Sequence, residues 1–230
     1  MAGPTYPPSP SDLRDMRLFG LEFPVRASIA LFATTAIILL DQAQVLVPLL
    51  PADGVAGLRP LTIQRFVLFL VVPLAIVVAA FRDTPGRYAF ALGDWRWGAA
   101  LLLAGLAVMT PIILALSGLD SFRGYYGGEA LPLGQRVANH LVELIPAEFL
   151  LRGFLMFALW RRIGPLALVV AQVPFVLTHI GKPDVELWST FIGGSIFAWL
   201  DWRTGSIVWS AVGHVYVLTL MVIAVGGATI

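Results

Sequence analysis

Six ionisable side chains stand inside long apolar stretches of this 230-residue chain. They comprise all three histidines, two glutamates and one arginine, namely His140, His179, His214, Glu143, Glu148 and Arg152. An ionisable side chain at the centre of a membrane costs about 2.5–3.5 kcal/mol on insertion scales. Each of the six therefore needs a protein partner or a water-filled cavity, and groups so placed commonly mark proton-transfer or substrate sites.

Glu148 and Arg152 are four residues apart in the sequence. On a helix this spacing places both side chains on one face, about 6 Å apart along the axis. The pair could be a structural ion pair that holds two helices together. Because the histidines also need an explanation, we favour the other reading, in which the pair supplies a carboxylate for general-base chemistry that the neighbouring cation keeps ionised.

The three histidines differ in their expected depth and direction. His214 has about ten apolar residues on either side, so it should face a protein cavity. His179 lies near the end of its stretch, where it could belong to a site or face the headgroups. His140 and Glu143 share a helix with Glu148 but lie about 80° and 140° around from it. For these last two we expect hydrogen bonds to another helix.

Seven stretches are long and apolar enough to suggest transmembrane helices. The chain is 58% hydrophobic and 13% charged, whereas soluble domains average roughly 45–50% apolar and about 25% charged residues. A spanning helix needs about 20 apolar residues. The candidates run near 25–48, 61–81, 98–118, 136–160, 164–181, 185–200 and 205–227. The sequence therefore predicts an all-α, polytopic transmembrane helix bundle, with the lipid bilayer as an obligatory partner.

The chain divides around these stretches into three regions. Residues 1–24 form a polar N-terminal tail, in which Asp12 to Phe23 could be an interfacial helix. Residues 25–135 hold the N-terminal transmembrane helices, and residues 136–230 hold the core with the ionisable groups. Asp41, near the end of the first stretch, is assigned no role. With the N-terminus inside, the inner side holds more arginine than the outer side, which fits the positive-inside rule. The inner set is Arg14, Arg17, Arg26, Arg82, Arg87, Arg96, Arg161, Arg162 and Arg203, and the outer set is Arg59, Arg65, Arg123, Arg136 and Lys182.

The residue content excludes several mechanisms. The chain has no cysteine, so it has neither a thiolate nucleophile nor a cysteine-ligated metal. It has no His-Glu-x-x-His zinc helix, and Ile196 follows Ser195 where a rhomboid protease has glycine. A net charge of +1 gives no electrostatic footprint for nucleic acid. We therefore expect no metal, no other cofactor and no nucleic-acid partner.

Three motifs stand in order along the last four stretches: Glu148-x-x-x-Arg152, then Phe175-x-x-x-His179, then His214. In this order and spacing the chain resembles the CAAX protease and bacteriocin-processing (CPBP, or Abi) family of intramembrane glutamic proteases. That family reads E-E-x-x-x-R, F-x-x-x-H and H-x-x-x-N.

The resemblance covers roughly residues 136–222 and includes two departures. Ala147 takes the place of the first glutamate of the family pair, and Leu218 takes the place of the asparagine. The chain therefore resembles a single-glutamate variant of the family.

The resemblance implies an endopeptidase that cleaves a membrane-tethered protein or peptide with an activated water and no cofactor. Glu148 together with His179 would activate that water, His214 would stabilise the oxyanion, and Arg152 would hold Glu148 in place. We expect these four side chains to converge on one water-accessible cavity within a four-helix catalytic core. We also expect a multi-pass protein of the bacterial inner (plasma) membrane.

Two alternatives to a peptidase remain open. The substitutions at Ala147 and Leu218 would also fit a catalytically silent CPBP-like protein that acts as a membrane binding partner or scaffold. A transporter could use Glu148, His179 and His214 as a proton relay. The absence of an internal repeat and of paired broken helices argues against the transporter.

The fifth and sixth stretches, at roughly 16–18 residues, reach only about 24–27 Å. They are joined by a polar turn from Gly181 to Asp184, on the outer side by the arginine and lysine count. A pair too short to span the bilayer must thin it or stop below its surface. We therefore expect the site to open beside this turn, toward the extracytoplasmic face.

Overall fold

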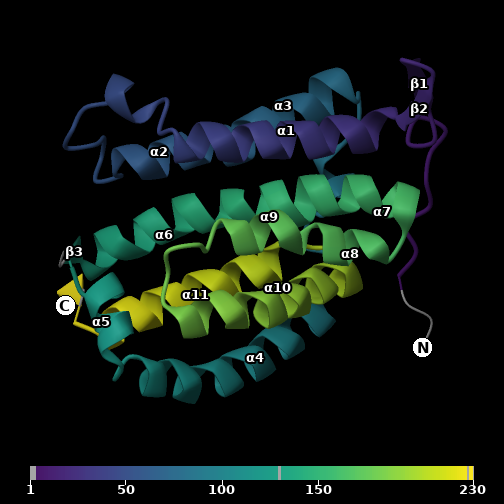
Figure 1. Cartoon of the computed structure of the whole chain (residues 1–230). Helices are drawn as coiled ribbons and strands as arrows, with labels where there is room; N and C mark the ends of the chain where they lie inside the picture. The colour runs from purple at the N-terminus through teal and green to yellow at the C-terminus, as the bar shows by residue number, and fades with distance from the viewer. Residues whose placement is uncertain (1–3, 129–130, 227, 230) are drawn as a thin grey trace.

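The computed structural model describes residues 4–128, 131–226 and 228–229 of the chain (Figure 1). Each of the seven apolar stretches contains helix, which confirms the predicted all-α bundle. The helices are α1 (Val25–Gln42), α2 (Pro60–Phe66), α3 (Val72–Ala75), α4 (Trp95–Leu116), α5 (Asp120–Tyr126), α6 (Leu133–Glu148), α7 (Phe157–Ile163), α8 (Leu166–Val170), α9 (Gln172–Leu177), α10 (Asp184–Thr204) and α11 (Val208–Ala224). Short 3₁₀ turns lie at Val47–Leu49 and Pro85–Tyr88, and two small strand pairs complete the fold.

Two of the long helices contain π-helical segments. The helix from Pro60 to Ala80 joins α2 and α3 through such segments at Val67–Val71 and Ile76–Ala80. The helix from Leu133 to Ile163 joins α6 to α7 through η5 (Phe149–Met156). All eight residues of η5 are buried, so this segment lies at the centre of the bundle.

The remaining helices pack around the helix that contains α6, η5 and α7. Helix α1 contacts η5 and α7, α2 contacts α6, and α11 packs between α6 and α4. Helices α9 and α10 pack against each other (Figure 1). Residues far apart in the sequence are thereby brought to the middle of the bundle.

Three helices are long and apolar enough to cross a membrane: α1, the helix from Pro60 to Ala80, and α4. Only 6% of the most apolar window of α4 is buried in the protein, so its apolar side chains face outward. The helices that carry the ionisable groups are shorter, interrupted or more polar. Apolar neighbouring helices cover these polar helices. With three helices that can cross the bilayer, the chain is an integral membrane protein.

Three of the predicted stretches differ from the helices in the structure, the first because α1 ends at Gln42 and not at residue 48. The stretch 164–181 forms two short helices, α8 and α9, with a break near Ala171. The stretch predicted as 185–200 is a helix of 21 residues, so it is not short. It continues to Gly205, where a φ of +69° ends the helix in the left-handed conformation that glycine adopts readily.

The prediction of an interfacial helix from Asp12 to Phe23 is wrong. The segment forms an antiparallel hairpin of β1 (Asp15–Leu18) and β2 (Leu21–Pro24). Apolar residues alternate with polar ones along both strands, which is a strand period and not a helix period. Phe19 and Gly20 both have positive φ, as a two-residue hairpin turn requires.

The N-terminal tail is fixed to the bundle by ion pairs. Asp12 pairs with Arg26 and Arg87, and Arg26 also pairs with Asp83. Burial acts to raise the pKa of the Asp12 carboxyl, but hydrogen bonds from Ser9, Arg26 and Arg87 outweigh it and hold that pKa below its usual value. The carboxylate therefore stays ionised and ties the tail to α1.

Candidate active site

Glu148 and Arg152 form a buried ion pair at the junction of α6 and η5. Glu148 is the last residue of α6, and its carboxylate accepts a hydrogen bond from the Arg152 guanidinium. The two side chains are 0% and 1% exposed. π-Helical segments are rare and are often found at functional sites. The π-helical backbone that begins directly after Glu148 is therefore a second indication of a functional site here.

His214, on α11, contacts the other oxygen of the same carboxylate. Its Nδ1 lies 2.7 Å from Oε1 of Glu148. With Glu148 ionised by Arg152, Nδ1–H of His214 is the donor in this bond. The contact fixes the ring's orientation and leaves Nε2 for a second partner.

Phe175, on α9, connects this pair to His179. The Arg152 guanidinium lies over the Phe175 ring, 4.2 Å from its centroid, and the His179 ring meets Phe175 edge-on at 4.6 Å. Nδ1–H of His179 donates to the Phe175 carbonyl oxygen at 2.9 Å. In neutral His179 the other ring nitrogen, Nε2, then carries the lone pair and can accept a hydrogen bond. The four side chains singled out in the sequence lie together in the fold.

A cavity of about 430 Å³ adjoins this group. His179 and His214 line it, whereas Glu148 and Arg152 do not. The expectation that all four side chains open to the cavity is wrong for the ion pair. The pair contacts Phe175 of α9 and His214 of α11, and these two side chains line the cavity in its place.

The two positions that depart from the family pattern, Ala147 and Leu218, both line the cavity. The cavity wall near the histidines is therefore apolar at these two positions. Glu143, one helical turn before Ala147, also lines it, and Arg65 of the helix from Pro60 to Ala80 pairs with its carboxylate. The predicted hydrogen bond of Glu143 to another helix is confirmed.

His140 and Asp41 make further contacts between helices. Nδ1 of His140 lies 2.8 Å from the Thr219 hydroxyl of α11, which confirms the expected partner on another helix. Asp41 accepts hydrogen bonds from Gln64 and Arg65. Both residues line the cavity. Within the part of the chain that the structure describes, no three histidine, aspartate or glutamate side chains are grouped so as to hold a metal ion.

Asp201 is a buried carboxyl group that sequence reasoning missed. It lies on α10, is fully buried, and accepts a hydrogen bond of 2.9 Å from the Ser210 hydroxyl. Ser210 stands one turn before His214 on α11, so this bond joins α10 to the turn that positions the histidine. The predicted stretch ended at residue 200, one residue before Asp201, so this carboxyl group was not among the candidates, whereas α10 continues to Thr204.

Gly194 of α10 makes room for Phe175. A Cβ at residue 194 would lie 2.3 Å from Oε1 of Gln172 and 2.7 Å from Cδ1 of Phe175, whereas a Cβ at Gly193 would meet nothing within 4 Å. We therefore expect Gly194→Ala to displace Phe175 and to destabilise the protein by about 1–3 kcal/mol through overpacking.

Gly193→Ala is the matched control, and it should be neutral or stabilising because alanine favours helix over glycine. Thermal unfolding in detergent measures both variants. Equal stability of the two variants would show that Phe175 is not held against α10.

Residues 129–220 match the family model described as "Type II CAAX prenyl endopeptidase Rce1-like". No curated protein and no solved structure shows a significant match to the chain. The matched range contains Glu148, Arg152, His179 and His214. It also contains both positions, Ala147 and Leu218, at which the chain departs from the family pattern.

Proposed function

We propose that this membrane protein is a glutamic-type intramembrane endopeptidase, since residues 129–220 match the Rce1-like family model. Its substrate would be a membrane-tethered protein or peptide, cut by water close to the bilayer. The observation that carries the proposal is the bond between Glu148 and His214, made beside a cavity that His179 also lines. The bacterial inner membrane is the location that we propose for the protein.

His179 is the general base of the proposed mechanism. The bond from its Nδ1–H to the Phe175 carbonyl leaves the lone pair of Nε2 available. A water held at Nε2 would lose its proton as its oxygen attacks the peptide carbonyl. The same imidazolium would then return the proton to the leaving amine, as general acid–base catalysis requires.

His214 is the electrophilic partner. A protonated His214 facing the Glu148 carboxylate can donate Nε2–H to the oxyanion of the tetrahedral intermediate. Glu148 then supplies the counter-charge, and Arg152 keeps Glu148 ionised and in place. In this scheme Glu148 acts through His214, because its carboxylate does not line the cavity.

The second candidate is the catalytically silent membrane binding protein or scaffold. The specific observation in its favour is that Ala147 and Leu218 leave apolar surface on the cavity wall. A cavity of about 430 Å³ could hold a peptide segment without cleaving it.

A pooled library of single-span peptides separates the two candidates. The peptides and the purified protein are placed together in lipid nanodiscs, and products are identified by mass spectrometry, with a Glu148→Gln preparation as the control for contaminating peptidases. The peptidase predicts cleavage near one end of the span by the wild type alone. Peptides that bind but are recovered intact from both preparations would favour the scaffold.

The side on which the cavity opens is a separate prediction. Lys182, in the turn after α9, lines the cavity. Arg162 lies near the C-terminal end of α7 and pairs with Asp15 of the hairpin. The chain has no native cysteine, so Asp184→Cys and Arg162→Cys each carry a single thiol. With a membrane-impermeant thiol reagent on intact cells, we expect labelling at residue 184 alone. Labelling at residue 162 alone would mean that the cavity faces the cytoplasm.

A further inference from the structure

The β1–β2 hairpin has one apolar face and one charged face. Met16 stands opposite Phe23, and Leu18 stands opposite Leu21. Residues directly opposite each other in an antiparallel pair share a face, so these four apolar side chains form one surface. The other surface holds Arg17 opposite Glu22, and Asp15 opposite Pro24.

Most of the apolar face is exposed, and only Phe23, next to α1, is partly buried. Met16, Leu18 and Leu21 are 37%, 45% and 62% exposed, and Phe19 at the tip is fully exposed. Phe19 also has a φ of +51°, a conformation that favours glycine or asparagine. A large aromatic side chain at a strained and fully exposed position indicates a contact that compensates for both costs.

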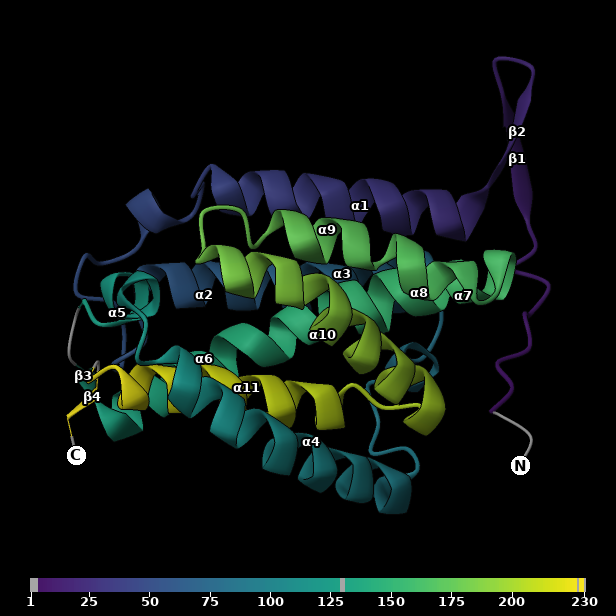
Figure 2. The ribbon, with the colours of Figure 1, turned by 60° about the horizontal axis from the view of Figure 1, so that its bottom comes forward.

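The hairpin is held at the end of a membrane-spanning helix. β2 ends at Pro24 and α1 begins at Val25, whose N–H donates to the Arg14 carbonyl. Asp15 pairs with Arg162 of α7, which fixes the base of β1 to the bundle. The strands stand crosswise to α1 and extend past the bundle (Figure 2).

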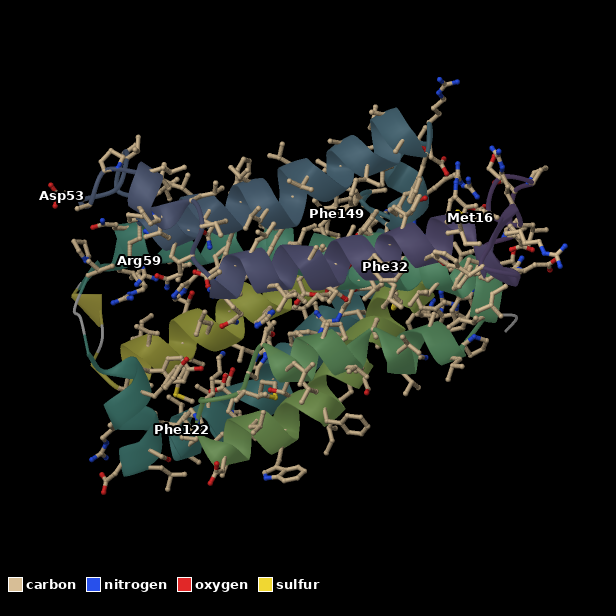
Figure 3. The ribbon with its side chains drawn as sticks, turned by 45° about the horizontal axis from the view of Figure 1, so that its top comes forward. Met16, Phe32, Asp53, Arg59, Phe122 and Phe149 are labelled. Carbon is tan, nitrogen blue, oxygen red and sulfur yellow. The ribbon has the colours of Figure 1, made fainter. Side chains whose placement is uncertain are left out.

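The hairpin also lies far from the cavity. Met16 of β1 and Arg59, which lines the cavity, are labelled at opposite ends of the bundle in Figure 3. An element crosswise to a spanning helix, at the level where that helix begins, runs along the membrane surface. The hairpin therefore lies at the depth of the headgroup layer, with its strands parallel to the membrane plane.

We propose that the β1–β2 hairpin is a bilayer anchor that lies in the headgroup layer with Met16, Leu18, Phe19, Leu21 and Phe23 toward the acyl chains. Its charged face then meets water, as in an amphipathic helix that lies in the interface. The depth is limited, because a two-stranded hairpin has unpaired backbone groups along both edges that only water or headgroups can satisfy. The anchor would fix the height of α1 in the bilayer, and it does not depend on the proposed peptidase activity.

Spin labels on single cysteines test the proposal, since the chain has no native cysteine. Phe19→Cys and Leu21→Cys report the apolar face, and Arg17→Cys and Glu22→Cys are the matched controls on the charged face. The labelled full-length protein is placed in nanodiscs of phosphatidylcholine and phosphatidylglycerol. Collision rates with oxygen, which concentrates in lipid, and with a water-soluble nickel chelate are then measured.

We expect the oxygen-to-nickel collision ratio to be several-fold higher at residues 19 and 21 than at residues 17 and 22. Equal ratios at all four sites, with free access of nickel, would show that the hairpin stands in water and would overturn the proposal. Shielding of residues 19 and 21 from both reagents would also overturn it, because a protein surface and not lipid would then cover this face.

Discussion

Glu148→Gln is expected to lower the kcat of peptide-bond cleavage by about 10²–10³-fold, the range seen when an oxyanion donor is lost. Glutamine keeps the size of the side chain but removes the negative charge that accepts the hydrogen bond from His214. The rate is measured with a peptide found in the library, in nanodiscs and at saturating concentration.

Glu143→Gln is the matched control for this prediction. It changes a carboxylate that lines the same cavity but is paired with Arg65. We expect it to retain most of the activity. If Glu143→Gln abolished cleavage and Glu148→Gln did not, the acting carboxylate would be the one on the cavity wall.

Arg152→Met is expected to destabilise the protein by about 3–5 kcal/mol, because it leaves the Glu148 carboxylate buried without its cation. Methionine preserves much of the side-chain volume, so the loss of charge is the main change. Chemical unfolding in detergent, followed by circular dichroism, measures the effect.

Arg162→Met is the control for Arg152→Met. Its ion pair with Asp15 is about a third exposed on each side, at 29% and 34%. Exposed pairs contribute about 0–1 kcal/mol, so this variant should unfold almost as the wild type does. The double variant Arg152→Met/Glu148→Gln should recover part of the lost stability, since it removes both buried charges. The Arg152 guanidinium lies over the rings of Phe175 and of Phe197 on α10, 4.2 Å and 5.4 Å from their centroids. No recovery would show that Arg152 stabilises the fold chiefly through these two ring contacts.

The sequence was sufficient to predict that Glu148, Arg152 and His214 gather at the centre of the fold, but not that Asp201 lies there too. Glu148, Arg152 and His214 stand deep in apolar stretches, where the cost of lipid exposure is high enough to force them toward one another. The family pattern added His179, whose position near a helix end was ambiguous by depth alone. The approximate positions of the helices followed from the lengths of the apolar stretches.

The arrangement around these residues could not be predicted in the same detail. Whether Glu148 or the neighbouring position 147 faces the cavity depends on the rotation of α6, and the π-helical turn that follows shifts the face presented by each later residue. Asp201 was missed because the end of α10 was placed too early. An interfacial helix was expected from Asp12 to Phe23, although Met16, Leu18, Leu21 and Phe23 follow a period of two around Gly20, which indicates a hairpin.

The claim that water attacks the peptide bond directly is tested most directly by time-resolved mass spectrometry of a single turnover in ¹⁸O-labelled water. The wild-type protein is in excess over one cleaved peptide, and both enzyme and products are weighed at each time. We expect one ¹⁸O atom in the new carboxyl group of the product and an unchanged enzyme mass throughout. An enzyme species that carries the mass of the acyl fragment would contradict the account, because it would show a covalent intermediate where His179 and His214 are proposed to act on water.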